Sequence, residues 1–363
     1  MRRLWRSVLD EVTPYEGGPP LEQLQAESGL SELVRLSANE NPLGPSPRAI
    51  EAIIAEAPRA HLYPDGGGTA LRQALGRHLG VPPEMILLGN GADELLALIA
   101  WAAFESGSEV IIPHPSFEPY YGVVTLSGAT PILSPLVDYQ TDLDDMRRRV
   151  NTRTKALILC SPHNPTGTIV RREPFGALLA EFGGDPPLVI LDEAYREFVD
   201  DPEAADGIAL LDRCPTLIVL RTFSKVAGLA GLRVGYAVTR AETVAKLHRV
   251  RAPYNVNRLA QAAGIAALED SEHRELTVRL IHEERRFLTR ALTERGFSVV
   301  PSEANFLLVS VGATATALRQ RLGQAGFLVR DGAAVGFPGH LRITLGTHAQ
   351  NVKLLAVLDR GEP

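Results

Sequence analysis

The stretch from residue 155 to residue 191 reads KALILCSPHNPTGTIVRREPFGALLAEFGGDPPLVIL. Two continuous apolar runs, KALILC and PLVIL, stand at its ends, and EPFGALLAEF between them has the apolar spacing of a helix. Continuous rather than alternating apolar runs are typical of strands that are covered on both faces. A strand, a helix and a second strand in this order form a parallel crossover. The stretch therefore predicts a layered α/β fold.

The same alternation extends to both sides of this stretch. Four more apolar runs are predicted as strands: MILL (85–88), EVIIP (109–113), TLIVL (216–220) and GYAVT (235–239). Helical patterns lie between them at 92–104 and 142–150. We expect a large domain over residues 35–256 with a mainly parallel sheet, and the first 34 residues, which contain PYEGGPP, as an N-terminal arm.

The pattern changes after residue 256. A long helical stretch (257–295) is followed by strand-like runs and two further helical segments. The strand-like runs are FSVVPS (297–302), NFLLVSV (305–311), FLVR (327–330) and HLRITLG (340–346), and the helices are expected at 313–325 and 347–359. This order predicts a smaller α+β domain over residues 257–363.

Composition excludes several classes of partner. The chain has 363 residues and carries 37 Lys and Arg against 43 Asp and Glu, a net charge of −6. Nucleic acids and acidic membranes attract clustered positive charge, so we expect no nucleic-acid partner. No run of 18 apolar residues is present, so we expect no membrane partner. Two cysteines, Cys160 and Cys214, form no disulfide framework or metal cluster, and a reducing cytoplasm is the expected location.

Polar residues gather directly after four of the predicted strands. GNGADE (89–94) follows MILL, SPHNPTG (161–167) follows KALILC, DEAY (192–195) follows PLVIL, and RTFSK (221–225) follows TLIVL. In open α/β sheets, ligands bind just beyond the carboxyl ends of the strands. The four clusters therefore predict a ligand site at this edge of the sheet.

Lys225 is the most informative residue of these clusters. The chain has only three other lysines, at positions 155, 246 and 353, which precede a strand or lie in amphipathic helices. Lys225 instead follows a buried strand and precedes the glycine-rich segment VAGLAGLRVGY. A partly desolvated amine has a lowered pKa and can form a Schiff base. A lysine that pairs with a phosphate, or has a structural role, is the alternative.

Two other clusters carry groups that suit a charged heterocycle. Asp192 ends a buried strand, where a carboxylate needs a partner; it is either the counter-ion of a protonated ring nitrogen or a helix cap. Tyr195 reaches the same ligand or packs in the core. GNGADE begins a helix, whose free N–H groups and dipole suit a phosphate. There the alternative is a glycine turn with a cap by Asp93 or Glu94.

The motifs NPTG, DEAY, TFSK and GLRVGY, in this order, resemble those of the fold-type I pyridoxal-phosphate (PLP) aminotransferases. Other segments resemble the histidinol-phosphate aminotransferases within that family: SANENPLGPSP (37–47), YPDGG (63–67), GNGADE (89–94), RTFSKVAGLAGLRVGYA (221–237), PYNVN (253–257), ANFLLV (304–309) and LRITLGT (341–347). The resemblance runs from about residue 14 to the end. It implies the PLP-dependent transferase fold, with a mainly parallel sheet of the seven-stranded type in the large domain.

The resemblance also implies a set of cofactor-binding and catalytic residues. Lys225 matches the Schiff-base lysine, Asp192 the partner of the pyridine nitrogen, and Tyr195 and Asn164 the donors to the phenolic O3′. Phe117, in HPSFEPY, matches an aromatic residue, often Tyr, that stacks on the PLP ring. The phosphate is expected at Ala92, Asp93, Glu94, Ser224 and Arg233, with Tyr63 reaching it from the partner subunit of a homodimer with shared sites.

Four residues match positions that contact the substrate: Tyr15 of the arm, Asn41, Arg330 and Arg342. The implied reaction transfers the amino group of L-histidinol phosphate to 2-oxoglutarate, giving imidazole acetol phosphate and L-glutamate, in histidine biosynthesis. An aminotransferase of phenylalanine or tyrosine is the main alternative. A PLP decarboxylase or C–S lyase, and a PLP-sensing regulator, are further alternatives; no basic DNA-binding module supports the regulator. No metal is expected.

Overall fold

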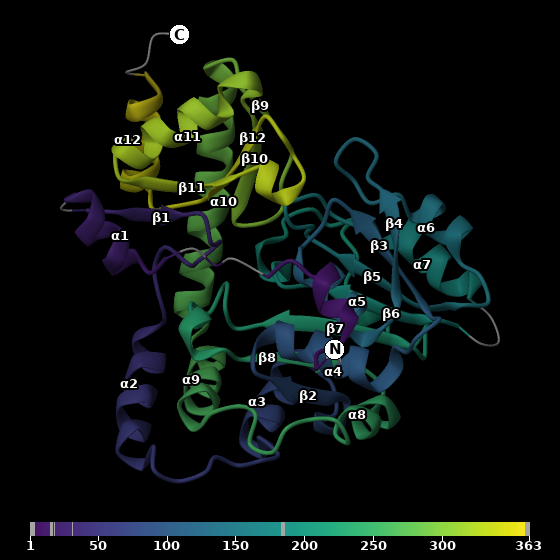
Figure 1. Cartoon of the computed structure of the whole chain (residues 1–363). Helices are drawn as coiled ribbons and strands as arrows, with labels where there is room; N and C mark the ends of the chain where they lie inside the picture. Colours follow the sequence, from purple (N-terminus) through teal and green to yellow (C-terminus); the bar gives the residue numbers. More distant parts are fainter. Residues whose placement is uncertain (1–3, 15–16, 18, 31, 183–185, 360–363) are drawn as a thin grey trace.

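The structure is a computed structural model that describes residues 4–14, 17, 19–30, 32–182 and 186–359. Its larger sheet has seven strands in the order β2-β8-β7-β6-β5-β3-β4 (Figure 1). The bounds are β2 (Ile86–Gly89), β3 (Glu109–His114), β4 (Thr130–Pro135), β5 (Thr154–Cys160), β6 (Leu188–Asp192), β7 (Leu217–Thr222) and β8 (Gly235–Val238). The pairings of β8 with β2 and with β7 are antiparallel, and the other pairings of this sheet are parallel. The predicted α/β fold with a mainly parallel sheet is confirmed.

Helices cover both faces of this sheet, as the continuous apolar strands predict. Successive residues of β5 alternate between the two cores: Leu157 and Leu159 face one, and Ala156 and Ile158 the other. The first core is closed by α2 (Pro47–Glu56), α3 (Thr69–Leu79), α6 (Leu143–Arg149), α7 (Arg172–Glu181) and α9 (Arg258–Glu269). The second is closed by α4 (Gly91–Ala103), α5 (Pro119–Ser127) and α8 (Ala241–Leu247).

The second sheet has five strands in the order β1-β11-β12-β10-β9. Its bounds are β1 (Val34–Leu36), β9 (Ser298–Val299), β10 (Phe306–Ser310), β11 (Phe327–Asp331) and β12 (His340–Thr344), and it packs against α10 (Ser271–Glu294), α11 (Ala315–Gln324) and α12 (His348–Asp359). Strand β1 pairs in parallel with β11. The second sheet therefore includes residues at the expected boundary between arm and large domain. The sequence did not predict this strand, because three residues are too few to show a pattern.

The long helical stretch after residue 256 is two helices rather than one. Asn257 caps α9 by accepting from the Ala260 N–H at 2.8 Å. Asp270 ends α9 and begins α10, where its carboxylate accepts from the His273 N–H at 3.1 Å. A side-chain acceptor of this kind satisfies an N–H that the helix itself leaves unpaired. Helix α10 then runs from beside α9 to the second sheet (Figure 1).

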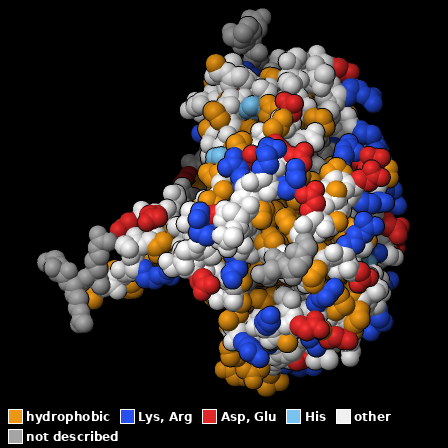
Figure 2. All heavy atoms as spheres, turned by 90° about the vertical axis from the view of Figure 1, so that its right-hand side faces the viewer, with side chains coloured by type: hydrophobic (Ala, Val, Ile, Leu, Met, Phe, Trp, Pro, Cys, Tyr) orange, Lys and Arg blue, Asp and Glu red, His pale blue; other side chains and the backbone are white. Residues whose placement is uncertain are grey.

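The part of the chain before β1 contains two short helices, the 3₁₀ helix η1 (Ser7–Glu11) and α1 (Leu21–Ser28). Among the described residues, no helix is long and apolar enough to cross a membrane. Charges of both signs are interspersed over the face shown in Figure 2, while hydrophobic side chains gather toward its lower end.

Candidate active site

A cavity of about 560 Å³ lies at the carboxyl ends of β5, β6 and β7, where the sequence placed the ligand site. It is bordered by the large sheet on one side and by residues of the second sheet on the other. The predicted site residues that line it are Ala92, Asp93, Phe117, Asn164, Asp192, Tyr195, Ser224, Lys225, Arg233, Arg330 and Arg342. Parallel strands thus bring together residues that are far apart along the chain.

Lys225 lies on the loop after β7, with its amine in the cavity. The Nζ atom donates to the Ala38 carbonyl at 3.3 Å and lies 5.5 Å from the centre of the Tyr195 ring. Desolvation, and after it the nearby guanidinium of Arg342, lower the pKa of the Lys225 amine from 10.5 to about 8. A larger fraction of this amine is therefore neutral and nucleophilic at neutral pH than that of an exposed lysine.

Asp192 is the last residue of β6 and is only 4% exposed. Its Oδ2 accepts from the Tyr120 hydroxyl at 2.7 Å, and its Oδ1 accepts from the Ala194 N–H at 3.0 Å. Burial raises the pKa of this carboxyl to about 6, although both hydrogen bonds act to lower it. A cation placed beside Asp192 would favour its ionised form.

In Asn164 and in Tyr195, the side-chain oxygen already accepts a hydrogen bond from another residue. The Oδ1 of Asn164 accepts from Arg342 at 2.7 Å, which leaves its Nδ2 as the group that can donate. The hydroxyl of Tyr195 accepts from the Nδ2 of Asn39 at 3.0 Å, so its own proton can be donated. Both side chains are thereby oriented as donors toward a ligand in the cavity.

The part of the cavity beside the start of α4 suits an anion. Helix α4 begins there, and the Asn90 side chain does not cap it. Arg233, in the left-handed region at φ 53°, pairs with Asp93 at 2.9 Å. The backbone of Gly91 passes so close to this arginine that a Cβ on it would lie 2.5 Å from the guanidinium. Cationic nitrogen and free helical N–H groups at one point form a binding place for a phosphate.

Two arginines from the second sheet face the cavity. Arg330 of β11 pairs with Glu118 at 3.4 Å. Arg342 of β12 is buried and also donates to the Ser37 carbonyl at 2.7 Å. Both arginines can bind an oxyanion with two parallel hydrogen bonds, which a lysine does less well.

Of the predicted site residues that the structure describes, three do not line this cavity. Glu94 accepts from the Asn90 N–H and the Asn255 amide at 2.5 and 2.6 Å, which is the capping role left open above. Asn41 instead anchors its loop, donating to the Val226 carbonyl at 2.9 Å. Tyr63 is 77% exposed and stacks on Tyr254. Tyr15 lies outside the described residues.

Some residues of the cavity carried no clear signal in the sequence. Asn39 and Glu40 lie within SANENPLGPSP, but nothing in that segment indicates which side chains turn inward. Glu118 and Tyr120 flank a proline after Phe117. The i, i+3 spacing is the one sign in the sequence that Tyr120 and Phe117 face the same side.

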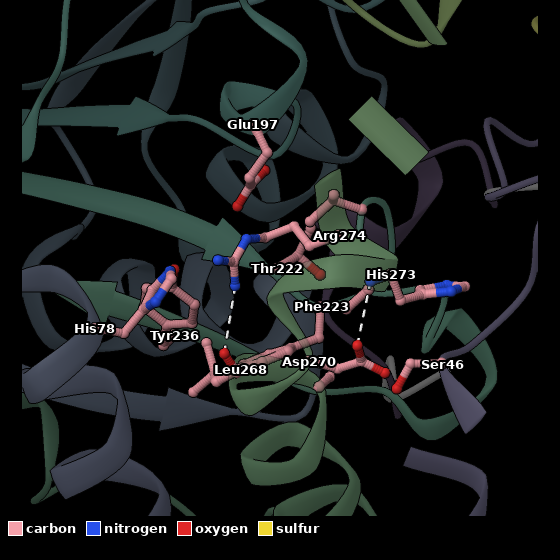
Figure 3. Close-up of a pocket in the computed structure, with 13 residues that line it drawn as sticks. Ser46, His78, Glu197, Thr222, Phe223, Tyr236, Leu268, Asp270, His273 and Arg274 are labelled. Atoms are coloured by element: carbon pink, nitrogen blue, oxygen red, sulfur yellow. Dashed lines mark hydrogen bonds between the residues drawn. The ribbon is translucent and has the colours of Figure 1, made fainter. Parts of the chain in front are cut away.

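A second, smaller cavity of about 40 Å³ is lined by Thr222 and Phe223, which precede Lys225 in the chain, and by side chains of other elements (Figure 3). Thr222 lines both cavities. Side chains from distant helices point into the smaller one, among them His78, Glu197 and Arg274 (Figure 3). The Arg274 guanidinium is held by the Leu268 carbonyl at 3.3 Å. Thr222 thus borders both cavities, whereas Phe223 lines the smaller one alone.

The larger cavity can bind a flat heteroaromatic aldehyde that carries a phosphate. An amine of lowered pKa, a buried carboxylate and an arginine beside a helix N-terminus all line it. No group of three or more His, Cys, Asp or Glu residues suited to a metal is found among the described residues.

Comparisons with known proteins agree with this site. Residues 31–358 match the family described as aminotransferase class I and II, and the chain therefore belongs to that family. A histidinol-phosphate aminotransferase from Symbiobacterium thermophilum is 42% identical over 355 residues, covering 97% of each chain. One from Anaeromyxobacter sp. is 43% identical over 351 residues, covering 96% of each chain.

A solved structure gives the same result. The histidinol-phosphate aminotransferase from Sinorhizobium meliloti, crystallised in complex with pyridoxal-5'-phosphate, matches with a TM-score of 0.89 and 30% identity. The match covers 99% of this chain and 97% of that chain. The family that the motifs indicated is thus confirmed.

Proposed function

We propose that the protein is a PLP-dependent aminotransferase that transfers the amino group of L-histidinol phosphate to 2-oxoglutarate, giving imidazole acetol phosphate and L-glutamate. The observation that carries the proposal is the position of Lys225, an amine of lowered pKa in one cavity with Asp192 and the anion-binding end of α4. The names of the full-length relatives support the choice of substrate.

The cofactor residues follow from the geometry of the cavity. PLP supplies an electron sink that stabilises negative charge at the substrate Cα. Lys225 would hold it covalently, and Asp192 would pair with its protonated ring nitrogen. Arg233, Ser224 and the first N–H groups of α4, at Ala92 and Asp93, would neutralise its phosphate. The side chain of Glu94 has no part in this set, because it caps the helix.

The remaining polar groups would orient the ring and move the proton. Asn164 and Tyr195 each have a free donor for the phenolic oxygen, since Arg342 and Asn39 occupy their acceptors. Phe117 would stack on the ring without a hydroxyl contact. The amine of Lys225, in its neutral form, would be the base that takes the proton from the substrate Cα.

The arginines of the second sheet would bind the ends of the two substrates. Arg342 suits a carboxylate or the phosphate end of histidinol phosphate, and Arg330 suits the phosphate. Because Arg330 pairs with Glu118 across the cavity, an incoming phosphate would exchange one anionic partner of Arg330 for another. Tyr15 and Asn41 stay in the proposal as substrate-binding residues only through the resemblance of their positions to those of the family.

A homodimer with shared sites is part of the proposal. Tyr63 is exposed, stacks on Tyr254 at 4.6 Å between ring centres, and does not line the cavity of its own chain. A tyrosine in this position is available to a second copy, where it would reach the cofactor phosphate. We expect gel filtration of the purified enzyme to give a dimer, and an active monomer would contradict the shared site.

A cytoplasmic location also belongs to the proposal. Cys160 and Cys214 are both free and buried, as suits a reducing compartment. Activity recovered from a fraction other than the cytoplasm would contradict it.

The first experiment tests the covalent link. Borohydride reduction of the purified enzyme followed by mass spectrometry should place a pyridoxyl group on Lys225, and Lys225→Ala should lose both the adduct and amino transfer. Lys155→Ala, at the start of β5, is the matched control and should keep both. A pyridoxyl group on another residue, or on none, overturns the assignment.

The second experiment tests the substrate. We expect kcat/KM for histidinol phosphate to exceed that for phenylalanine, with the amino group recovered in glutamate. A preference for phenylalanine of more than about tenfold, equal to about 1.4 kcal/mol of transition-state stabilisation, would favour the aromatic alternative. Loss of CO₂ or of a thiol without glutamate formation would instead indicate a decarboxylase or a lyase.

A further inference from the structure

The carboxylate of Asp192 is held by a tyrosine that the residue assignments above leave without a function. Tyr120 lies in the first turn of α5, is 0% exposed, and donates its hydroxyl to Asp192 Oδ2 at 2.7 Å. A buried tyrosine hydroxyl requires a polar partner, and here that partner is a carboxylate at the ligand cavity. The Ala194 N–H holds the other oxygen, so the carboxylate plane is fixed from two sides.

We propose that Tyr120 is a positioning residue that orients the Asp192 carboxylate toward the cofactor ring and stabilises its ionised form. The inference rests on the proposed role of Asp192 as the partner of the ring nitrogen. Each carboxylate oxygen has about two lone-pair sites, and one on each is already used by Tyr120 or Ala194. The remaining sites can face the cavity, with no rotation of the carboxylate needed when the cofactor binds.

The surroundings of Asp192 explain why this donor matters. The titratable groups around it are Tyr120 from α5, Cys160 from β5, Asp93 from α4, and Glu193 and Tyr195 next to it in the chain. None of these groups is a cation, and two of them, Asp93 and Glu193, are acids. The two acids and burial all raise the pKa of Asp192 and so disfavour its ionised form. Cys160 lies opposite Asp192 in the β5–β6 register, and its thiol reaches the Pro162 carbonyl at 3.2 Å. Of these side chains, the Tyr120 hydroxyl is the one that donates to the carboxylate.

Packing alone does not explain a tyrosine at this position. The ring lies in the core with Leu95, Val124 and Ile158, and makes an edge contact with Phe117 at 5.4 Å between ring centres. A phenylalanine would fill the same space and keep these contacts. Only the hydroxyl would be lost, together with its hydrogen bond to Asp192.

The test compares Tyr120→Phe with Tyr121→Phe in the full-length enzyme. Tyr121 is the neighbouring residue of α5, but its hydroxyl bonds to the Pro113 carbonyl and to His114, away from Asp192. Because hydrogen bonds to charged groups are worth more than neutral ones, we expect the PLP dissociation constant of Tyr120→Phe to rise about tenfold or more. We also expect a shift in the pH midpoint of the bound cofactor's visible absorbance. Tyr121→Phe should match the wild type in both.

Kinetics separate positioning from simple damage to the fold. We expect kcat of Tyr120→Phe to fall about tenfold, with KM for the amino substrate changed by less than about threefold, because the Tyr120 side chain is fully buried and its hydroxyl is bonded to Asp192. The urea midpoint of the apoprotein shows whether the variant folds. Loss of affinity in Tyr121→Phe as well, or a change in KM without one in kcat, would overturn the proposal.

A double-mutant cycle provides a second test that does not depend on activity. In the Asp192→Asn background, Tyr120→Phe should change the PLP dissociation constant by less than about threefold, because the two side chains act as a unit. Equal losses in both backgrounds would overturn the positioning role. This result is distinguishable from failure of the proposed function. If the pyridoxyl adduct forms on Lys225 while Tyr120→Phe behaves as wild type, only the present inference fails.

Discussion

In the protein without cofactor, the burial of Asp192 opposes the negative charge of its carboxylate. Asp192 is almost fully buried, and burial raises the pKa of its carboxyl from 3.8 to about 6. The folded protein therefore binds more protons at this residue than the unfolded chain between about pH 4 and pH 6. Stability contributed by Asp192 is then lost as the pH rises through that window.

The corresponding prediction compares the wild-type apoprotein with Asp192→Asn. The difference in unfolding free energy between them should shift against the wild type by up to ~3 kcal/mol between about pH 4 and pH 7. Urea unfolding of both apoproteins at the two pH values measures it. Both proteins contain all the other titratable groups, so the contributions of those groups cancel in the difference. A difference that does not change with pH, or that favours the wild type as the pH rises, would contradict the prediction.

The sequence predicts the charged residues of the site better than the neutral residues that form hydrogen bonds around them. Lys225 and Asp192 stand directly after apolar strands, where their charge is conspicuous. Tyr120 and Asn39 are neutral residues in a helix and a loop, and their partners lie 72 and 156 residues away in the chain. Only the folded backbone brings such pairs together.

The elements around the cavity meet in close backbone contacts. Gly228, on the loop after Lys225, has φ +68°, and a Cβ there would lie 2.3 Å from the Gly44 carbonyl oxygen. We expect Gly228→Ala to destabilise the protein by about 2–4 kcal/mol, through strain at positive φ and a clash with backbone that cannot give way. Thermal or urea unfolding measures the loss, and amino transfer should fall with it.

Gly231→Ala is the matched control for this substitution. It lies three residues further along the same segment, and a Cβ there meets nothing within 4 Å. We expect a change within about 0.5 kcal/mol, as for ordinary surface positions. Equal stability of the two variants would show that the contact between the two loops is not tight.

The elements themselves were largely predictable from periodicity. The six strands expected in the large sheet are present as β2, β3, β5, β6, β7 and β8. Strand β4, TPILSP, was missed because it is an edge strand with mostly unburied side chains and two prolines, which are typical of edges. The break at Asp270 was missed because polar residues in a helical pattern do not show which of them caps a helix.

The two sheets are joined through buried polar contacts of α10. Arg285 is buried and donates to the carbonyls of Phe198 and Ala304, at 3.0 and 3.3 Å, and to Glu303 at 3.1 Å. Phe198 lies in the connection between β6 and β7 of the large sheet, whereas Ala304 precedes β10 of the second sheet. One guanidinium thus fixes the position of both sheets relative to the helix.

We expect Arg285→Ala to destabilise the protein by about 1–3 kcal/mol, because it removes three hydrogen bonds of a buried guanidinium. The Phe198 carbonyl keeps its contact with His282 and the Glu303 carboxylate keeps the Asp200 N–H, whereas the Ala304 carbonyl loses its side-chain donor. It should also raise KM for the phosphate substrate, since Arg330 and Arg342 lie on the second sheet. Arg286→Ala is the control, as its exposed side chain reaches only Asp200 at 3.8 Å. Urea unfolding and steady-state kinetics of both variants decide the matter, and similar losses in the two would contradict a specific role for Arg285.

The pairing of Val34 with Phe327 joins the beginning of the chain to its last third. All strands of the large sheet lie between residues 86 and 238, so that sheet can form while the ribosome is still synthesising the rest. The smaller sheet cannot be completed until nearly the whole polypeptide has emerged. Nascent chains halted before β11 should therefore expose Val34 and Leu36 to chaperones and proteases.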